Sequence, residues 1–191
     1  PTFSWNRSLL MNAFFETTRL IIRDWNPETD AEPAFKIYGE PDVMRFINSP
    51  VTASVEAQKV ALETTIEKYA KLDNGTGSWA VLEKETGEIV GAILLKQLPD
   101  NEGNLTQDYE VGWHLRKASW GKGYATEAGK WALEYGFKVL KLPVIYAVAK
   151  PENYASIRVM QRLGMIPMGR TKRYYGAELE LFRIESQMGN G

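Results

Sequence analysis

Several segments of the chain alternate apolar and polar residues, or form short apolar runs bounded by Gly, Pro, Asn and Asp. Alternation is typical of a strand with one buried face, and a short apolar run is typical of a strand buried on both faces. We therefore predict strands at residues 18–25, 78–83, 89–98, 109–115, 144–148, 165–175 and 178–185.

Other segments carry apolar residues at the spacing of a helix face. Ser54 and Asn153 stand where N-cap residues are expected, and Gly164 stands where a C-cap is expected. Residues 43–47 fit a short helical turn, and residues 99–107 fit a polar loop. The predicted helices are residues 31–38, 55–72, 124–139 and 154–163.

The order of these elements predicts one domain of the α/β (α+β) class. A strand that follows the helix at 124–139 implies a crossover connection, whereas the short connections elsewhere favour antiparallel neighbours. We expect a mixed, mostly antiparallel, twisted sheet of about seven strands flanked by about four helices. The domain is assigned to residues 18–186, with an N-terminal extension at 1–17 and a C-terminal tail at 187–191.

Composition narrows the functional classes. The chain has 191 residues, 44% of them hydrophobic and 25% charged, and a net charge of −1. Such a charge favours neither nucleic acid nor a membrane surface as a partner, and no apolar run is long enough for a membrane span. Cysteine is absent and His114 is the only histidine, so we predict no metal site. The opening residues lack the long apolar region of a secretion signal, which makes the cytoplasm the expected location.

The stretch at residues 108–138 contains the clearest candidate chemistry. Gly121-Lys122-Gly123 separates a predicted strand from a predicted helix, and Arg116 and Lys117 lie just before it. A helix N-terminus presents unpaired N–H groups and a partial positive charge, which together bind phosphate. The loop is therefore predicted to bind an anion such as a pyrophosphate.

Three motifs carry a family resemblance. The segment Trp-Gly-Lys-Gly-Tyr-Ala-Thr-Glu-Ala at residues 120–128 is followed by Asn-Tyr-Ala-Ser at 153–156 and Leu-Gly-Met at 163–165. Their order and spacing resemble the GNAT superfamily of N-acetyltransferases, and within it the RimJ/RimL-type branch. The resemblance extends over roughly residues 18–184. It implies acetyl-CoA as cosubstrate and a primary amine as acceptor.

The resemblance also implies which residues bind the cofactor. The pantetheine arm is expected along the strand before the loop, and Asn153 is expected to fix the arm. Trp120 departs from the family motif, because the Arg or Gln expected there is absent, so backbone N–H groups must provide most of the phosphate contacts. The predicted cofactor-binding residues are Trp113, His114, Leu115, Lys117, Gly121, Lys122, Gly123, Tyr124, Ala125, Thr126, Asn153 and Ser156.

Two residues are predicted to be catalytic by the same resemblance. Many family members protonate the departing thiolate with a Tyr on the second crossover helix, but Val159 and Met160 occupy the nearest positions here. Ser156 matches a Ser that approaches the thiol in the RimJ/RimL-type branch. Glu110, on the strand leading to the pantetheine site, is the candidate base, acting directly or through water.

Simpler interpretations of the same residues stay open. Asn153 can be an N-cap alone, Ser156 a solvated hydroxyl, and Glu110 a salt-bridged strand residue. His114 has an ordinary pKa near neutrality, but its position favours a backbone role over that of a base.

The acceptor is predicted by resemblance to be a protein N-terminal amine of the ribosomal-protein type. An aminoglycoside or polyamine is one alternative, and a non-catalytic CoA-binding sensor is another. The acidic residues Glu178 and Glu180 are candidates for holding a cationic amine. A homodimer is possible, with the aromatic-rich hairpin at residues 173–180 as the candidate surface.

Overall fold

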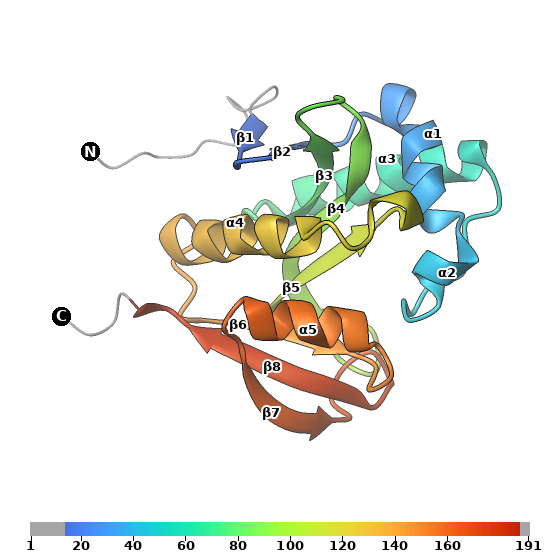
Figure 1. Cartoon of the computed structure of the whole chain (residues 1–191). Coiled ribbons are helices and arrows are strands. Elements are labelled where there is room, and N and C mark those ends of the chain that lie inside the picture. Colours follow the sequence, from blue (N-terminus) through green and yellow to red (C-terminus); the bar gives the residue numbers. More distant parts are fainter. Residues whose placement is uncertain (1–13, 188–191) are drawn as a thin grey trace.

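An eight-stranded sheet runs through the described part of the protein, residues 14–187 of the computed structural model (Figure 1). Its strand order is β1-β2-β3-β4-β5-β6-β8-β7, and every neighbouring pair is antiparallel except β5 and β6. The strands are β1 Phe14–Glu16, β2 Leu20–Arg23, β3 Gly77–Glu83, β4 Ile89–Pro99, β5 Leu105–Leu115, β6 Val144–Ala149, β7 Ile166–Thr171 and β8 Leu179–Glu185.

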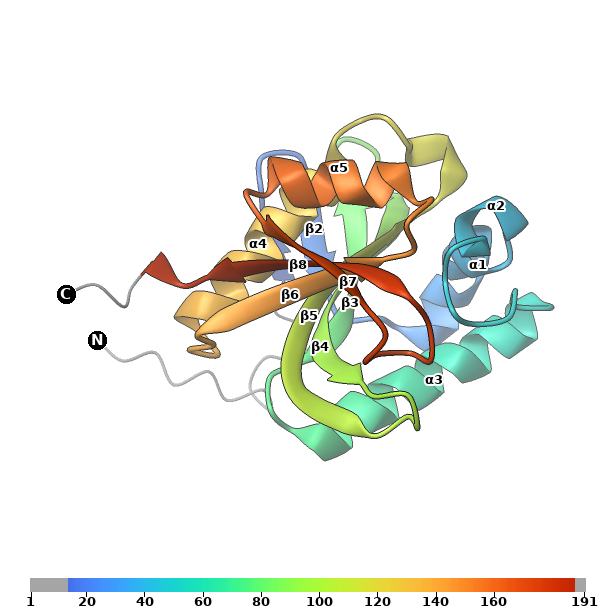
Figure 2. The same cartoon turned by 90° about the horizontal axis from the view of Figure 1, so that it is seen from below.

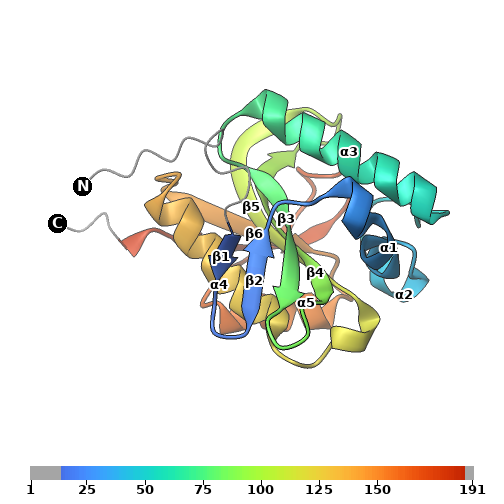
Figure 3. The same cartoon turned by 90° about the horizontal axis from the view of Figure 1, so that it is seen from above.

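Helices cover both faces of this sheet (Figure 3). Leu62 of α3 and Ile37 of α1 pack with Ala92 of β4 on one face, whereas Leu133 of α4 packs with Ile93 of β4 on the other. The helices are α1 Pro27–Tyr38, α2 Pro41–Met44, α3 Val55–Leu72, α4 Tyr124–Lys138 and α5 Tyr154–Arg162, with the short 3-10 helix η2 at Lys117–Ser119. None of the helices described in the structure is long and apolar enough to cross a membrane.

Local capping explains where several helices begin and end. The Ser54 side chain accepts a hydrogen bond from the Ala57 N–H at 3.1 Å, which satisfies a free donor at the start of α3. Asn153 does the same for Ser156 at the start of α5, at 3.3 Å. The chain leaves α5 through Gly164, whose φ of 78° suits a residue without a Cβ.

The sheet opens between β5 and β6. These parallel strands share one register pair, Glu110 with Tyr146, after which β5 continues to Leu115 without pairing to β6. Figure 2 shows the two strands diverging. The edge of β5 beyond Glu110 that faces β6 therefore carries backbone groups free of sheet hydrogen bonds.

The predicted fold class is confirmed, and the structure adds detail at the element ends. Helix α1 starts at Pro27 rather than at residue 31, because Asn26 caps it and proline suits the first helical turn. The predicted polar loop at 99–107 is shorter, since β5 begins at Leu105.

One strand was not predicted. β1 lies within residues 1–17, the range assigned to an N-terminal extension. Residues 1–13 of that range lie outside the described part of the chain, and so do residues 188–191 of the predicted tail. Phe15 packs against Trp131 and Tyr135 of α4, with ring centroids 5.0 and 6.1 Å apart. This contact between distant segments holds β1 beside β2, and no local alternation signals it.

Two strand glycines beside the opening provide a matched test of packing. A Cβ added to Gly91 of β4 would lie 2.5 Å from the His114 carbonyl oxygen, whereas one added to Gly112 of β5 would lie 3.8 Å from its nearest neighbour, Glu110. Gly91→Ala should destabilise the fold by about 1–3 kcal/mol, because the backbone of β5 must move. Gly112→Ala should change stability by less than about 1 kcal/mol. Urea unfolding measures both, and equal effects would contradict this account.

Candidate active site

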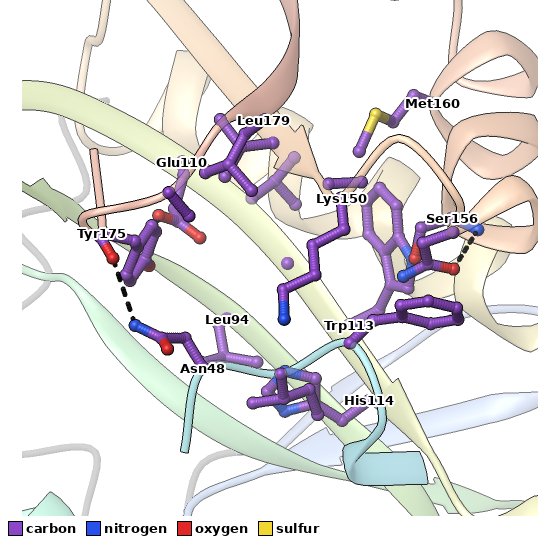
Figure 4. A pocket seen from close by; sticks show the side chains of 18 of the residues that line it. Asn48, Leu94, Glu110, Trp113, His114, Lys150, Ser156, Met160, Tyr175 and Leu179 are labelled. Carbon is purple, nitrogen blue, oxygen red and sulfur yellow. Dashed lines mark hydrogen bonds between the residues drawn. The ribbon is translucent and has the colours of Figure 1, made fainter. Parts of the chain in front are cut away.

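A cavity of about 270 Å³ lies where β5 separates from β6 (Figure 4). Its wall combines five regions of the chain: the loop after α2, the paired strands β4 and β5, the end of β6, the start of α5, and the connection between β7 and β8. The polar side chains that line it belong to Asn48, Ser49, Lys96, Glu110, Trp113, His114, Lys150, Asn153, Ser156 and Tyr175.

Glu110 is the acidic residue of this wall. Its side chain is almost fully buried, at 7% exposure, and accepts a hydrogen bond from the Tyr175 hydroxyl at 2.6 Å. Burial raises the pKa of the Glu110 carboxyl, while the nearby charges of Lys96 and Lys68 and the Tyr175 hydrogen bond act in the opposite direction. A carboxyl whose pKa is moved toward neutrality is suited to exchange protons in a working enzyme.

Tyr175 reaches Glu110 from the connection between β7 and β8. Its backbone has a φ of 58°, which is uncommon for a residue with a side chain. The Asn48 side-chain amide donates to the Tyr175 carbonyl at 3.2 Å, and the Tyr175 N–H donates to the Pro99 carbonyl at 3.3 Å. Contacts from two other segments therefore stabilise the conformation that turns this side chain inward.

The opposite side of the cavity is formed by β5 and α5. The Trp113 indole N–H donates to Ser156 Oγ at 3.3 Å, and Ser156 lies in the first turn of α5 beside its cap Asn153. A serine hydroxyl has one proton and two acceptor positions, so the indole contact leaves the Ser156 proton free for another acceptor. Glu110 and Ser156 enter the cavity from opposite sides (Figure 4).

His114 lies on the same face of β5 as Glu110. Its ring Nδ1 is 3.0 Å from the Tyr38 hydroxyl of α1. Burial, with a smaller contribution from the Lys96 charge, lowers the pKa of His114 from 6.5 to about 4. The imidazole is therefore neutral near pH 7 and bonded to α1.

The glycine loop lies outside the cavity wall, between η2 and α4. Gly121 and Gly123 have φ values of 76° and 78°, and Gly123 precedes Tyr124, the first residue of α4. No side chain caps the N-terminus of α4, so its first N–H groups are available to a ligand. The Thr126 hydroxyl oxygen in this first turn is buried and has no hydrogen-bond partner among the described residues. These features fit a phosphate group.

The cations near this loop differ from those expected. Lys117 is paired with Asp42 of α2, so its charge is already matched by a carboxylate. Arg19, which the sequence analysis did not single out, donates to the Lys122 carbonyl at 2.7 Å and lies over the Tyr124 ring at 4.7 Å. Its Nε also contacts Glu127 of α4 at 2.8 Å. Arg19 thus links the turn before β2 to the glycine loop.

Trp120 and the hairpin acids occupy unexpected places. Trp120 is 46% exposed, and its indole N–H donates to the Leu115 carbonyl at 3.0 Å, which links the loop to the end of β5. Glu178 is exposed and Glu180 pairs with Arg170, so neither lines the cavity. Glu178 and Glu180, which were predicted to hold a cationic amine, are therefore not part of this cavity.

The structure brings five predicted site residues together in one cavity: Glu110, Trp113, His114, Asn153 and Ser156. Leu115, Lys117 and the residues 121–126 lie apart from it, along β5 and at the start of α4. Sequence reasoning missed Lys96 and Lys150, and it placed Tyr175 on a hairpin that was a candidate dimer surface. Lys96 lies directly opposite Glu110 on the neighbouring strand, and pairing the two predicted strands would have indicated it.

Among residues 14–187, no three acidic or histidine side chains gather as a metal site would need.

Comparison with known proteins identifies the family. Residues 19–166 match the family model described as acetyltransferase (GNAT) domain. The uncharacterized N-acetyltransferase YnaD of Bacillus subtilis (strain 168) is 31% identical over 175 residues, which cover 86% of this chain and 95% of that protein. The chain therefore belongs to the GNAT family of N-acetyltransferases, enzymes that use acetyl-CoA as cosubstrate.

Solved structures agree with this assignment. A GNAT-family acetyltransferase from Bacillus anthracis shares 26% identity with a TM-score of 0.73, covering 91% of this chain and 98% of that one. A ribosomal-protein-S5-alanine acetyltransferase from Vibrio fischeri has a TM-score of 0.68 over 92% of this chain and 98% of that one. Its identity of 22% shows a shared fold alone.

The single histidine allows a direct test of the electrostatics of the site. The folded chain should bind the His114 proton near pH 4, and the unfolded chain near pH 6.5. The free energy of unfolding should therefore decrease as pH falls through this window. An NMR titration of the imidazole C2–H resonance measures the folded value. Lys96→Met should raise it, because the Lys96 charge opposes protonation. A folded-state midpoint near 6.5 would contradict the burial of this ring.

Proposed function

We propose that the protein transfers the acetyl group of acetyl-CoA to a primary amine that binds in the cavity beside Glu110. The observation that supports this most directly is the presence, on opposite sides of one cavity, of a buried carboxyl and a serine hydroxyl whose proton is available. Acyl transfer to an amine needs a proton acceptor for the amine and a donor toward the departing sulfur. Glu110 and Ser156 match these two roles.

The proposed cofactor site runs from the cavity along β5 to the glycine loop. Trp113, His114 and Leu115 would offer the unpaired β5 backbone to the amides of the pantetheine arm, while Asn153 would fix the arm from α5. The pyrophosphate would meet the backbone N–H groups of Gly121, Gly123, Tyr124 and Ala125, the hydroxyl of Thr126 and the ammonium of Lys122. Lys117 would contribute less, because Asp42 pairs with it.

The proposed reaction begins with the amine bound as an ammonium ion near Glu110. Glu110 accepts one proton, directly or through water, and the neutral nitrogen attacks the thioester carbonyl carbon. The attacking nitrogen then carries one proton too many. As the carbon–sulfur bond breaks, this second proton passes through the Ser156 hydroxyl to the sulfur, so that CoA leaves as the thiol and the nitrogen becomes that of an amide. Tyr175 holds the Glu110 carboxylate in place throughout.

For the acceptor, we propose a protein N-terminal amine and membership of the RimJ/RimL-type branch. The Asn153-to-Ser156 motif supports the branch, and a small cavity bounded by the loop after α2 suits the first residue of a peptide. A small amine is the alternative. The polyamine version has less support, since Glu178 and Glu180 do not line the cavity.

The predicted homodimer and the predicted location are also part of this proposal. A homodimer is still proposed, but the hairpin tyrosines are poor candidates for its surface. Tyr174 is 2% exposed and Tyr175 points into the cavity. A cytoplasmic location also stays a prediction.

Acetyl-CoA binding is the first test of this proposal. At 1 mM, a ligand with a Kd on the order of ten micromolar stabilises a protein by about 2.7 kcal/mol. For a chain of this size, the melting temperature should rise by roughly 5–10 °C. Gly123→Val should reduce the shift, because a side chain strains the left-handed backbone at the start of α4. No shift for the parent protein at millimolar acetyl-CoA would contradict the proposal.

Catalysis is tested separately with Glu110→Gln and Ser156→Ala, by following release of the CoA thiol. The parent should lose activity as pH falls through the pKa of Glu110, which lies above the ordinary 4.5. Glu110→Gln should lower kcat by about 10²–10⁴-fold and remove that acidic limb. Ser156→Ala should lower kcat while leaving the acidic limb intact. Parent-like turnover in both variants would refute these roles, and acetyl-CoA binding without thiol release from any amine would favour a non-catalytic sensor.

A further inference from the structure

The cavity contains more positive than negative side chains. Among the described residues that line it, Lys96 and Lys150 carry ammonium groups, whereas Glu110 carries the one carboxyl group. A cavity designed for a polycation would have the opposite balance, because like charges repel at short range. The excess positive charge therefore bears on the choice of acceptor.

The charge of Lys96 already has a partner. Lys96 lies directly opposite Glu110 in the β4–β5 register, and its ammonium is 5.1 Å from the centroid of the Tyr175 ring. Lys68 of α3 adds a second positive charge that acts on Glu110. The Glu110 carboxylate is thus balanced from its own side of the cavity, before any substrate binds.

Lys150 is different. It follows the last residue of β6, and its side chain points into the cavity (Figure 4). Its ammonium forms no hydrogen bond or ion pair with any residue in the described range 14–187, whereas Lys59, Lys71, Lys84 and Lys117 all form ion pairs. An ammonium that enters a partly enclosed cavity loses solvation, and an anion bound beside it compensates for that loss.

We propose that the acceptor is a primary amine with a carboxylate close to the amine, and that Lys150 selects it by binding this carboxylate. This inference rests on the proposed function. The two ends of such an acceptor complement the site, because the amine meets Glu110 and the carboxylate meets Lys150. The carboxylate can belong to a free amino acid or to an acidic first residue of a peptide, and the two sources share this chemistry.

Matched acceptors test the proposal on the purified full chain. Acetyl transfer from acetyl-CoA is measured by thiol release for a free amino acid, for its amide, for spermidine and for phosphoethanolamine. Two further acceptors are a short peptide that begins with Asp and its counterpart that begins with Asn. The carboxylate member of a pair should show a kcat/KM at least about tenfold higher than its amide, which is the effect of one charged hydrogen bond. The pair with the larger preference identifies the source of the carboxylate.

Substitutions at Lys150 assign the preference to this residue. Lys150→Met should abolish it by raising KM for the carboxylate acceptor, with little change in kcat. Lys150→Arg should retain it, and Lys150→Glu should shift the preference toward spermidine. Lys130→Met on the exposed surface of α4 is the control for lost charge, and it should leave the preference unchanged. Melting temperatures of all variants show whether each one is folded.

The outcomes separate the two proposals. Preference for the amide, for spermidine or for phosphoethanolamine by the parent protein would overturn the carboxylate inference while acetyl transfer stands. A preference that survives in folded Lys150→Met would remove Lys150 from the inference in the same way. Absence of thiol release with every amine would instead refute the proposed transferase activity, and the inference with it.

Discussion

The separation of β5 from β6 is the constraint on which the site depends. A parallel pair that stays in register would bury its backbone groups in a continuous ladder. Here the ladder is reduced to Glu110 and Tyr146, because β6 turns to pair along its length with β8. The opening exposes one edge of β5 and creates the cavity between two parts of a single sheet. The polar cavity is thus formed by the paired strands of the sheet.

The rest of the domain supports this opening from both sides. On one side, α1 and α3 pack on β3 and β4, and the contact of Tyr38 with His114 fixes the β5 face that lines the cavity. On the other, α5 approaches through Ser156 and Trp113. The connection between β7 and β8 closes a third side with Tyr175. Because each wall belongs to a different element, the positions of the polar groups depend on the packing of the whole domain.

Local chemistry explains why much of the fold was predictable. Ser54 and Asn153 accept hydrogen bonds from N–H groups in the first turns of the helices that follow them, and Gly121 and Gly123 adopt left-handed φ values without the strain that a Cβ brings. The place of Glu110 was also predicted, because it lies on the strand that leads to the glycine loop. These inferences use interactions within a few residues, or a motif that resembles a family.

Long-range pairings explain what was missed. Lys117 was expected to support phosphate, but Asp42 of α2 comes beside it only in the folded domain. Arg19, which precedes β2, reaches the glycine loop across more than a hundred residues of chain. Tyr175 was placed on a hairpin expected to be a dimer surface, and it turns inward because Asn48 and Pro99 bind its backbone. No spacing in the sequence encodes these contacts.

The sequence by itself therefore determined the order of the elements from β2 onward, the caps, the glycine loop and the resemblance to the family. Tertiary structure alone decided the charge of the cavity, because Glu110, Lys96, Lys150 and Tyr175 come from separate strands and connections that meet only where β6 leaves β5. The direction of a side chain at the end of a strand depends on the neighbour it loses there. Lys150 follows the last residue of β6 at this opening, and its ammonium forms no ion pair within the described part of the chain.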